Sequence, residues 1–532
     1  MSSTNPVKAL PYPGDVLLLF AMLSPFVLFA LLAQAQQLVN FFPDDAFYYL
    51  QTADQLLLRG FPTFDGLNPT NGFHPLFFLL VTLTDLLTGK AALMQGLFLL
   101  NTLFIALSII LMMQFLARFP SMLRSLLLLL LLLLLLLLLL MLPVYLLYFW
   151  MSAGMEASLV LLCFLLFVHA WLKAQQAAFE DRRCNLLLSG VISLLMLARL
   201  DMVIPLAVFI AGLGWYGLSH WQSNGGYTSR KMVVEVLLLP LLVGFAYLTF
   251  NYATTGHMVP ISGLIKQHYF IPFSISWNAV TGGGKMVLQL LVIAPFFLAL
   301  LALFFVNRVR LNSNRANAIT FLLTSLALLL YGLYLAFYAS NFFHWYLAMP
   351  FAAAAYLLVQ LAGLIKIERV RLNGRSGRLI LLLLCALIGT SANSAFLAWT
   401  GWKRQSTSYH LMQAAKQLDR LGDESVRAAT FDAGAIGFFS RHQVINLDGL
   451  ANSHDYFFNY RLPGRLQEYL QQQQVDYLLV RDGHLENREE VLSGDYSHAR
   501  YLPDPRIRLA RQDEQFRYSI PGGFTVIAYR YR

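Results

Sequence analysis

The sequence has few charged residues and few cysteines. Of its 532 residues only 12% are charged, whereas about a quarter of an ordinary soluble domain is charged. This scarcity excludes an ordinary soluble enzyme. The three cysteines, Cys163, Cys184 and Cys385, lie in or beside apolar runs and form no C-x-x-C pair, which excludes a disulfide framework and a cysteine metal site.

Long apolar runs are what the sequence has instead, and 58% of its residues are hydrophobic. A transmembrane helix needs about 20 apolar residues. The runs of that length predict about eleven membrane spans, at 15–38, 91–117, 125–147, 158–173, 185–199, 202–219, 232–250, 286–306, 318–340, 345–365 and 379–400. The expected fold class is an α-helical polytopic membrane protein, with a membrane domain at 1–400 and a small extracytoplasmic α/β domain at 401–532.

The orientation of the spans follows from the basic residues. The apolar stretch 75–88 has only 14 residues and carries Asp85, so we interpret it as an interfacial or re-entrant helix. Sixteen Lys and Arg residues then fall on the side of the N-terminus and five on the other. Because Lys and Arg mark the cytoplasmic side, the N-terminus is predicted to be cytoplasmic and the C-terminal domain periplasmic, in a bacterial inner membrane. The net charge of +10 is thus an orientation signal, and no nucleic-acid partner is expected.

The composition changes at residue 401, where charges become frequent. Apolar runs typical of strands, at 427–431, 443–447, 475–480 and 524–530, alternate with helical stretches at 406–421 and 463–473. This alternation predicts the α/β domain. The string DAGAIGFF at 432–439 lacks the G-x-G-x-x-G spacing and does not predict a dinucleotide site.

The first external loop, residues 39–90, carries an acidic pair, Asp44 and Asp45. After Pro43, the two acids suit the first turn of a helix, where they either cap the helix or act as the acid/base site for a hydroxyl nucleophile. Two adjacent Asp could also ligate a divalent cation, and whether a metal binds stays open. The helix is expected to lie on the membrane, with one face towards an aqueous cavity: Asp44, Tyr48, Gln51, Thr52 and Gln55.

Further polar residues fall on the same predicted side of the membrane. They are Asn71, His74, Glu156, Arg199, Asp201, Lys266, His268, His344 and Tyr346. Each has a structural explanation as well, such as a loop-packing histidine, a neutral helix-end acid, an Arg–Asp pair, a snorkelling lysine or an aromatic belt. Their gathering at one face favours an active site at the membrane boundary.

Several strings at these positions carry a family resemblance. They are PDDAFYYLQTADQLLLRG, TFDGLNPTNGFHPLF, SAGMEASL, LARLDM, the stretch 256–266, FFHWY and DAGAIGFFSRHQVINLDGLAN. Together they resemble a bacterial branch of the GT-C glycosyltransferases, a superfamily that includes protein O-mannosyltransferases, aminoarabinose transferases and arabinofuranosyltransferases. The resemblance implies a membrane enzyme that moves a sugar, with inversion, from a polyprenyl-phosphate donor to a hydroxyl of a lipid, glycan or protein acceptor at the outer face.

The resemblance also implies roles for residues. Asp44 matches the catalytic acid of the family and Asp45 its neighbour, and we predict that Asp44 is the general base. Lys266 and Arg199, with His268, are expected to hold the carrier phosphate. The expected substrate-binding residues are Tyr48, Tyr49, Asn71, His74, Glu156, Asp201, His344 and Tyr346.

A polytopic transporter or flippase for a sugar-lipid is the alternative function, and a catalytically silent sugar-lipid binding protein is a third. Transporters place ionisable groups near the bilayer midplane and often contain internal repeats. Here the acids lie at span ends and no repeat is evident, so the sequence favours an enzyme.

Overall fold

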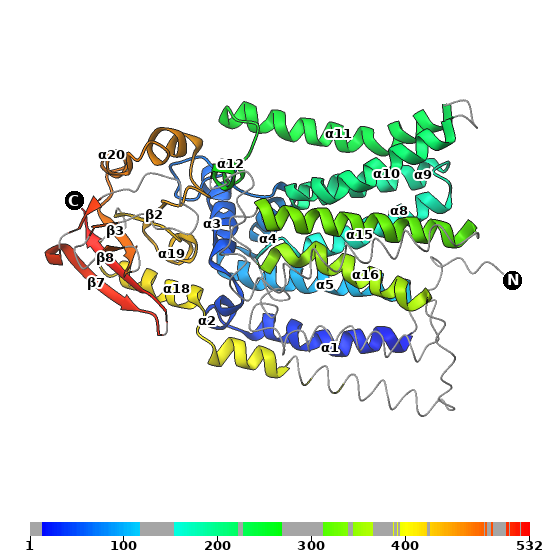
Figure 1. The fold of residues 1–532 in the computed structure, drawn as a ribbon. Helices are drawn as coiled ribbons and strands as arrows, with labels where there is room; N and C mark the ends of the chain where they lie inside the picture. The colour runs from blue at the N-terminus through cyan, green and yellow to red at the C-terminus, as the bar shows by residue number, and fades with distance from the viewer. Residues whose placement is uncertain are drawn as a thin grey trace.

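The computed structural model of the protein describes two parts, a bundle of apolar helices and a small sheet domain at its C-terminal end (Figure 1). The described residues are 13–116, 154–221, 227–268, 312–338, 344–364, 387, 391, 394–422, 426–482, 485–486, 491–492, 507–509, 511–521 and 523–531.

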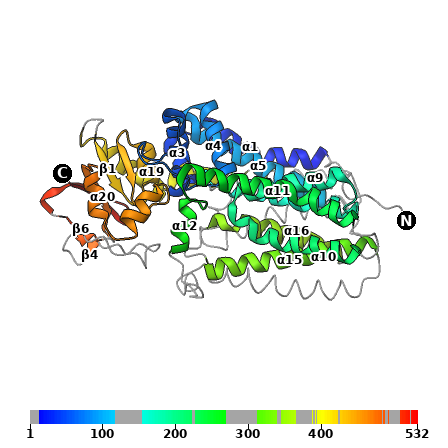
Figure 2. The ribbon, with the colours of Figure 1, turned by 90° about the horizontal axis from the view of Figure 1, so that it is seen from above.

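The bundle consists of long helices that run side by side (Figures 1 and 2). Its described members are α1 (Pro13–Leu32), α5 (Leu93–Leu116), α8 (Ala157–Gln176), α9 (Arg182–Ala198), α10 (Val203–Trp221), α11 (Tyr227–Thr255), α15 (Asn312–Tyr338) and α16 (Ala348–Leu364). Among the described residues, four helices are long and apolar enough to cross a membrane: Lys90–Gln114, Ala157–Gln176, Leu200–Leu218 and Arg230–Thr255. The chain is a multi-pass membrane protein.

The eight bundle helices named above coincide with eight of the predicted spans. The predicted spans at 125–147 and 286–306, and most of the span at 379–400, lie outside the described residues, as does the leucine run at 126–140. The total of about eleven therefore stays a prediction. The stretch 75–88 forms a separate short helix, α4 (Pro75–Thr88), with Pro75 in its first turn.

Short elements cover the end of the bundle that faces the C-terminal domain. They are α2 (Ala35–Leu38), a 3₁₀ turn (Val39–Phe41), α3 (Asp44–Arg59), a 3₁₀ turn (Lys90–Ala92) and α12 (Ile261–His268). Helix α3 lies across the helix ends, between the bundle and the sheet (Figure 1). It begins after Pro43 and ends at Gly60, whose positive φ of 82° suits a glycine C-cap.

The C-terminal domain contains a mixed five-stranded sheet in the order β2-β1-β3-β8-β7. Its strands are β1 (Arg427–Thr430), β2 (Gln443–Asn446), β3 (Tyr477–Arg481), β7 (Glu514–Ser519) and β8 (Thr525–Arg530). β1 is parallel to β2 and β3, whereas β8 is antiparallel to β3 and β7. The helices are α18 (Thr407–Leu418), α19 (Gly434–Phe439) and α20 (Leu466–Gln472), and β4 (Leu485–Glu486), β5 (Val491–Leu492) and β6 (Ile507–Arg508) form a second small sheet.

The two faces of the large sheet belong to different cores, because successive strand residues point to opposite sides. Ala429, Ile445 and Leu478 pack in a core of the domain's own. Their neighbours Ala428, Val444 and Leu479 belong to the core that continues into the helix bundle. The predicted small C-terminal sheet domain is thus confirmed, and one face of it shares its core with the membrane part.

Candidate active site

A cavity opens where α3, the bundle and the C-terminal domain meet. Residues from all three parts line it: Asp45, Tyr48, Tyr49, Thr52, Thr70, Gly72, Phe73, His74, Met155, Glu156, Arg199, Ser262, Trp345, Leu450 and Ala451. Of the residues predicted from sequence, Asp45, Tyr48, Tyr49, His74, Glu156 and Arg199 are therefore brought together.

Helix α3 turns Asp45 towards the cavity. Residues three, four and seven positions along a helix share a face, and Tyr48, Tyr49 and Thr52 line the cavity together with Asp45. Of the face predicted from sequence, Tyr48 and Thr52 line the cavity, whereas Asp44, Gln51 and Gln55 do not, so the register of the predicted face was only partly right. The hydrophobic residues could not fix that register, because the helix is buried on several sides at once, against bundle, loop and sheet domain.

Asp44 points away from the cavity lining, towards the first turn of α19. The backbone amide of Ala435 donates to Asp44 Oδ1 at 2.7 Å, and that of Gly434 donates to Oδ2 at 3.3 Å. Burial raises the pKa of Asp44 well above its usual range, the nearby Asp432 raises it further, and the bond from Ala435 acts in the opposite direction. The acid of the pair that lines the cavity is Asp45.

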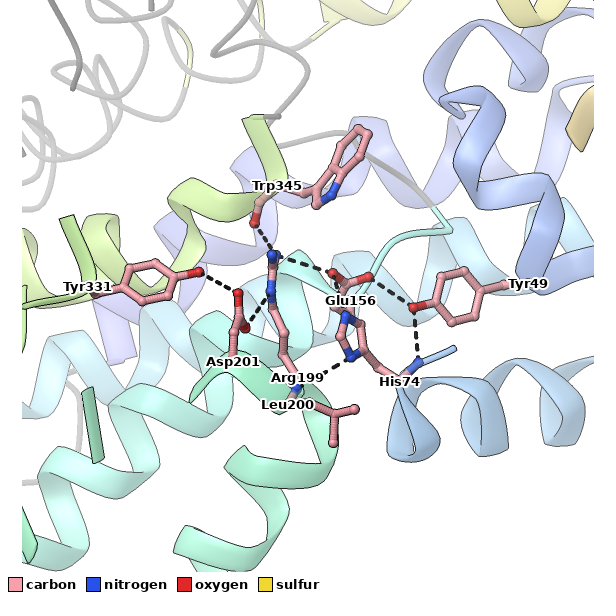
Figure 3. Close-up of polar contacts among 8 residues, drawn as sticks. All are labelled: Tyr49, His74, Glu156, Arg199, Leu200, Asp201, Tyr331 and Trp345. Carbon is pink, nitrogen blue, oxygen red and sulfur yellow. Dashed lines mark hydrogen bonds and ion pairs between the residues drawn. The ribbon is translucent and has the colours of Figure 1, made fainter. Parts of the chain in front are cut away.

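A buried ion-pair network forms the bundle side of the cavity (Figure 3). The Arg199 guanidinium lies 3.2 Å from Glu156 Oε1 and 2.9 Å from Asp201 Oδ1, and the side chains of Arg199 and Glu156 are only 3% and 2% exposed. Arg199 also donates to the carbonyl oxygen of Trp345, and the Tyr331 hydroxyl donates to Asp201 Oδ2 at 3.0 Å. The Arg199 guanidinium thus forms ion pairs with the carboxylates of both Glu156 and Asp201.

His74 and Tyr49 extend this network across the cavity (Figure 3). The amide of Leu200 donates to His74 Nδ1 at 3.4 Å, so in the neutral ring Nε2 carries the proton. His74 Nε2 lies 3.8 Å from Glu156 Oε1. The Tyr49 hydroxyl donates to Glu156 Oε2 at 3.5 Å and accepts from the His74 amide at 3.3 Å. Glu156 is therefore the acceptor on which three side chains converge.

The other predicted site residues have different positions. Asn71 is buried away from the cavity lining, where its amide donates to Asn251 and its oxygen accepts from the Ile261 amide at 3.0 Å. The ring of Tyr346 stacks against the Arg199 guanidinium, 4.0 Å from its centroid. The side chains of Lys266, His268 and His344 lie outside the described part of the structure, although Ser262 places α12 at the cavity.

Sequence reasoning missed more than half of the residues that line the cavity. Trp345 lies between two predicted residues of the string FFHWY, and Gly72 and Phe73 lie between Asn71 and His74. Leu450 and Ala451 belong to the string NLDGLAN of the C-terminal domain. That string was noted for its resemblance, but one sequence does not reveal which distant loop meets α3.

The residues present do not fit a metal ion at the acidic pair. Both oxygens of Asp44 accept backbone hydrogen bonds from α19. In the part of the chain that the structure describes, no group of three His, Cys, Asp or Glu residues is arranged to hold a metal.

Comparison with solved structures identifies the fold. The structure of ArnT from Cupriavidus metallidurans, bound to undecaprenyl phosphate, matches with a TM-score of 0.51 over 97% of both chains, at 12% identity. The chain has the GT-C fold.

The GT-C assignment does not rest on the other comparisons. The archaeal oligosaccharyltransferase AglB from Archaeoglobus fulgidus matches with a TM-score of 0.43 and 13% identity, over 95% of this chain and 74% of that one. Residues 400–521 match a family described as Domain of unknown function (DUF8728). No curated protein sequence matches the chain.

Proposed function

We propose that this GT-C protein is an inverting glycosyltransferase that moves a sugar from a polyprenyl-phosphate donor to a hydroxyl of a lipid, glycan or protein acceptor. The observation that carries the proposal is the position of Asp45, in a cavity at one end of an apolar helix bundle with the GT-C fold. The structure of ArnT bound to undecaprenyl phosphate supports a lipid carrier of that class. We infer that the site lies on the periplasmic side of a bacterial inner membrane, because the Lys and Arg residues concentrate in the loops on the other side.

Asp45 is the general base in this mechanism. It accepts the proton of the acceptor hydroxyl, whose oxygen attacks the anomeric carbon of the sugar as the bond from that carbon to the phosphate oxygen breaks. The polyprenyl phosphate leaves with the bonding electrons. A base in this role contributes about 10²- to 10⁴-fold to the rate. The sequence alone favoured Asp44 as the base, and we propose Asp45 instead because Asp45 lines the cavity and Asp44 does not.

The leaving phosphate gains negative charge and needs a cation. Arg199 lines the cavity, but Glu156 and Asp201 already offset its charge. Lys266 is therefore our preferred phosphate ligand, since α12 borders the cavity through Ser262. Arg199 instead pairs with Glu156, which accepts a hydrogen bond from Tyr49 and orients His74.

Substitution of the two acids tests the proposal. We expect Asp45→Asn to lower the turnover of sugar transfer by about 10²- to 10⁴-fold in the purified protein, because the amide cannot accept the proton. Transfer is measured with polyprenyl-phosphate sugars extracted from the source cells and an envelope fraction as acceptor.

Asp54→Asn is the matched control, since Asp54 lies on the same helix and pairs with Lys90 at 2.8 Å, outside the cavity lining. Its turnover is expected to stay within about threefold of wild type. Full turnover of a folded Asp45→Asn variant would overturn the assignment of the base, and absence of transfer by the wild type would overturn the function.

A further inference from the structure

The C-terminal domain is joined to α3 through an extensive polar contact. The Tyr48 hydroxyl donates to Asp448 Oδ2 at 2.6 Å. The same hydroxyl accepts from the amide of Ala433 at 3.2 Å and from Asn446 Nδ2 at 3.1 Å. Asp448 raises the pKa of Tyr48 in addition to burial, so the phenol stays protonated as the donor that this contact requires.

Two further contacts flank Tyr48. Asp44 accepts the first amides of α19, as described above. The rings of Phe47 and Phe438 pack with their centroids 5.4 Å apart. With the continuous apolar core, these contacts fix one face of the domain against the helix that carries Asp45.

The loop that follows Asp448 reaches the cavity itself. Leu450 and Ala451 line it together with residues from the bundle. The loop lies so close to the first external loop that a Cβ added to Gly72 would stand 1.9 Å from the carbonyl oxygen of Leu450. A Cβ on Gly434 would likewise stand 2.1 Å from the carbonyl oxygen of Asp44. Only glycine permits either approach.

We propose that the loop Gly449–Ala451 of the C-terminal domain is the acceptor-side wall of the cavity, and that Asp44 and Tyr48 are positioning residues that hold this wall against Asp45. This inference rests on the proposed function. The C-terminal domain lies at one end of the apolar bundle (Figures 1 and 2). A lipid carrier held in the membrane is expected to reach the cavity from the bundle, whereas Leu450 and Ala451 line the cavity from the C-terminal domain. The wall therefore contacts the acceptor, close to its reacting hydroxyl, rather than the polyprenyl chain of the donor.

A pair of glycine substitutions tests the wall. Gly72→Ala forces Leu450 to move, whereas Gly190→Ala, within α9, adds a methyl group with no atom within 4 Å. Acceptor and donor dependence are measured separately with the envelope fraction and the extracted donor, and binding of undecaprenyl phosphate is measured by native mass spectrometry.

We expect Gly72→Ala to raise the amount of envelope acceptor needed for half-maximal transfer by tenfold or more, with the dependence on donor and the binding of undecaprenyl phosphate within twofold of wild type. Gly190→Ala should leave all three unchanged. Tyr48→Phe, which keeps the ring but loses three hydrogen bonds, should shift the acceptor dependence in the same direction and serves as the second variant if Gly72→Ala does not fold.

The proposal is overturned if Gly72→Ala and Tyr48→Phe both match Gly190→Ala. It is also overturned if donor and acceptor dependence change equally, because that result indicates a general loss of structure. In both cases the wild type still transfers sugar. Failure of the proposed function differs, since the wild type then transfers none.

Discussion

Asp44 and Asp45 are adjacent in sequence, but their surroundings separate them. A raised pKa makes Asp44 the stronger base, yet a base acts only within hydrogen-bond reach of the proton it removes. The oxygens of Asp44 accept amides of Gly434 and Ala435. The location of each carboxylate therefore decides which one acts as the base, and Asp45 is the one that lines the cavity.

Arg199 is expected to contribute strongly to the stability of the folded protein. Arg199→Leu leaves Glu156 and Asp201 without a counter-charge at a site where Arg199 and Glu156 are almost fully buried. Breaking such a buried pair by removing one partner costs about 3–5 kcal/mol. We expect a clear fall in the thermal unfolding midpoint of the purified protein in detergent.

Lys90→Met gives the comparison for Arg199→Leu. Its ion pair with Asp54 is partly exposed, with the lysine side chain 39% accessible, and pairs of that kind contribute about 1 kcal/mol or less. Replacing Glu156 with Gln and Asp201 with Asn in the Arg199→Leu background should reverse most of the fall in the unfolding midpoint, because the neutral side chains need no counter-charge. Equal midpoints for Arg199→Leu and Lys90→Met would contradict a stabilising role of the network.

At the scale of the elements, the sequence predicted local structure better than the contacts between elements. Apolar runs placed the bundle helices, and the strand runs at 427–431 and 443–447 became β1 and β2. Such patterns depend only on neighbours along the chain. The rotation of α3 and the approach of loop 449–451 depend on segments about 400 residues away, such as Asp448 opposite Tyr48. No local sequence pattern predicts a contact between segments so far apart in the chain.

A stacked pair of histidines joins the loop after α11 to the C-terminal domain and predicts a pH dependence. The rings of His257 and His454 stack with centroids 4.4 Å apart, and His454 also contacts the carbonyl oxygen of Val259. Burial lowers the pKa of His454 to about 4, and His257 lowers it as well. An unfolded histidine titrates near about 6.5, so the unfolded chain binds the proton more tightly.

The fold should therefore lose stability as the pH falls from about 6.5 towards 4, and this dependence is absent above that window. Thermal unfolding between pH 4 and pH 8 measures it. His454→Phe retains a ring to stack on His257 and should show a shallower slope than wild type. A residual slope is expected from His410, whose pKa burial also lowers. Identical slopes in wild type and His454→Phe would exclude His454 as the titrating group.

At the scale of the whole molecule, polar chemistry collects at one end. Helix α3 and the sheet domain lie at the end of the bundle opposite the start of α1 (Figure 1). The cavity is lined by residues of both, such as Asp45 and Leu450. Burial of one sheet face in the core of the bundle makes the domain part of the same folded body. This arrangement suits chemistry between a carrier anchored in the membrane and an acceptor that arrives from outside it.

The orientation of this body in the membrane is the remaining prediction, and exposed positions at its two ends test it. Gln471 is exposed in the C-terminal domain, and Glu180 is exposed in the turn between α8 and α9. Basic residues cluster near Glu180, at Lys173, Arg182 and Arg183, and therefore favour a cytoplasmic position for that end.

Single cysteines at these positions, in a chain whose own cysteines are replaced by alanine, are labelled with a membrane-impermeant maleimide. In cells with only a permeabilised outer membrane, Gln471→Cys should react and Glu180→Cys should not. Glu180→Cys should react once the inner membrane is disrupted, because the reagent then reaches the cytoplasmic face. The reverse labelling pattern would place the cavity on the cytoplasmic side of the membrane. It would contradict both the orientation predicted from the basic residues and the periplasmic location of the site.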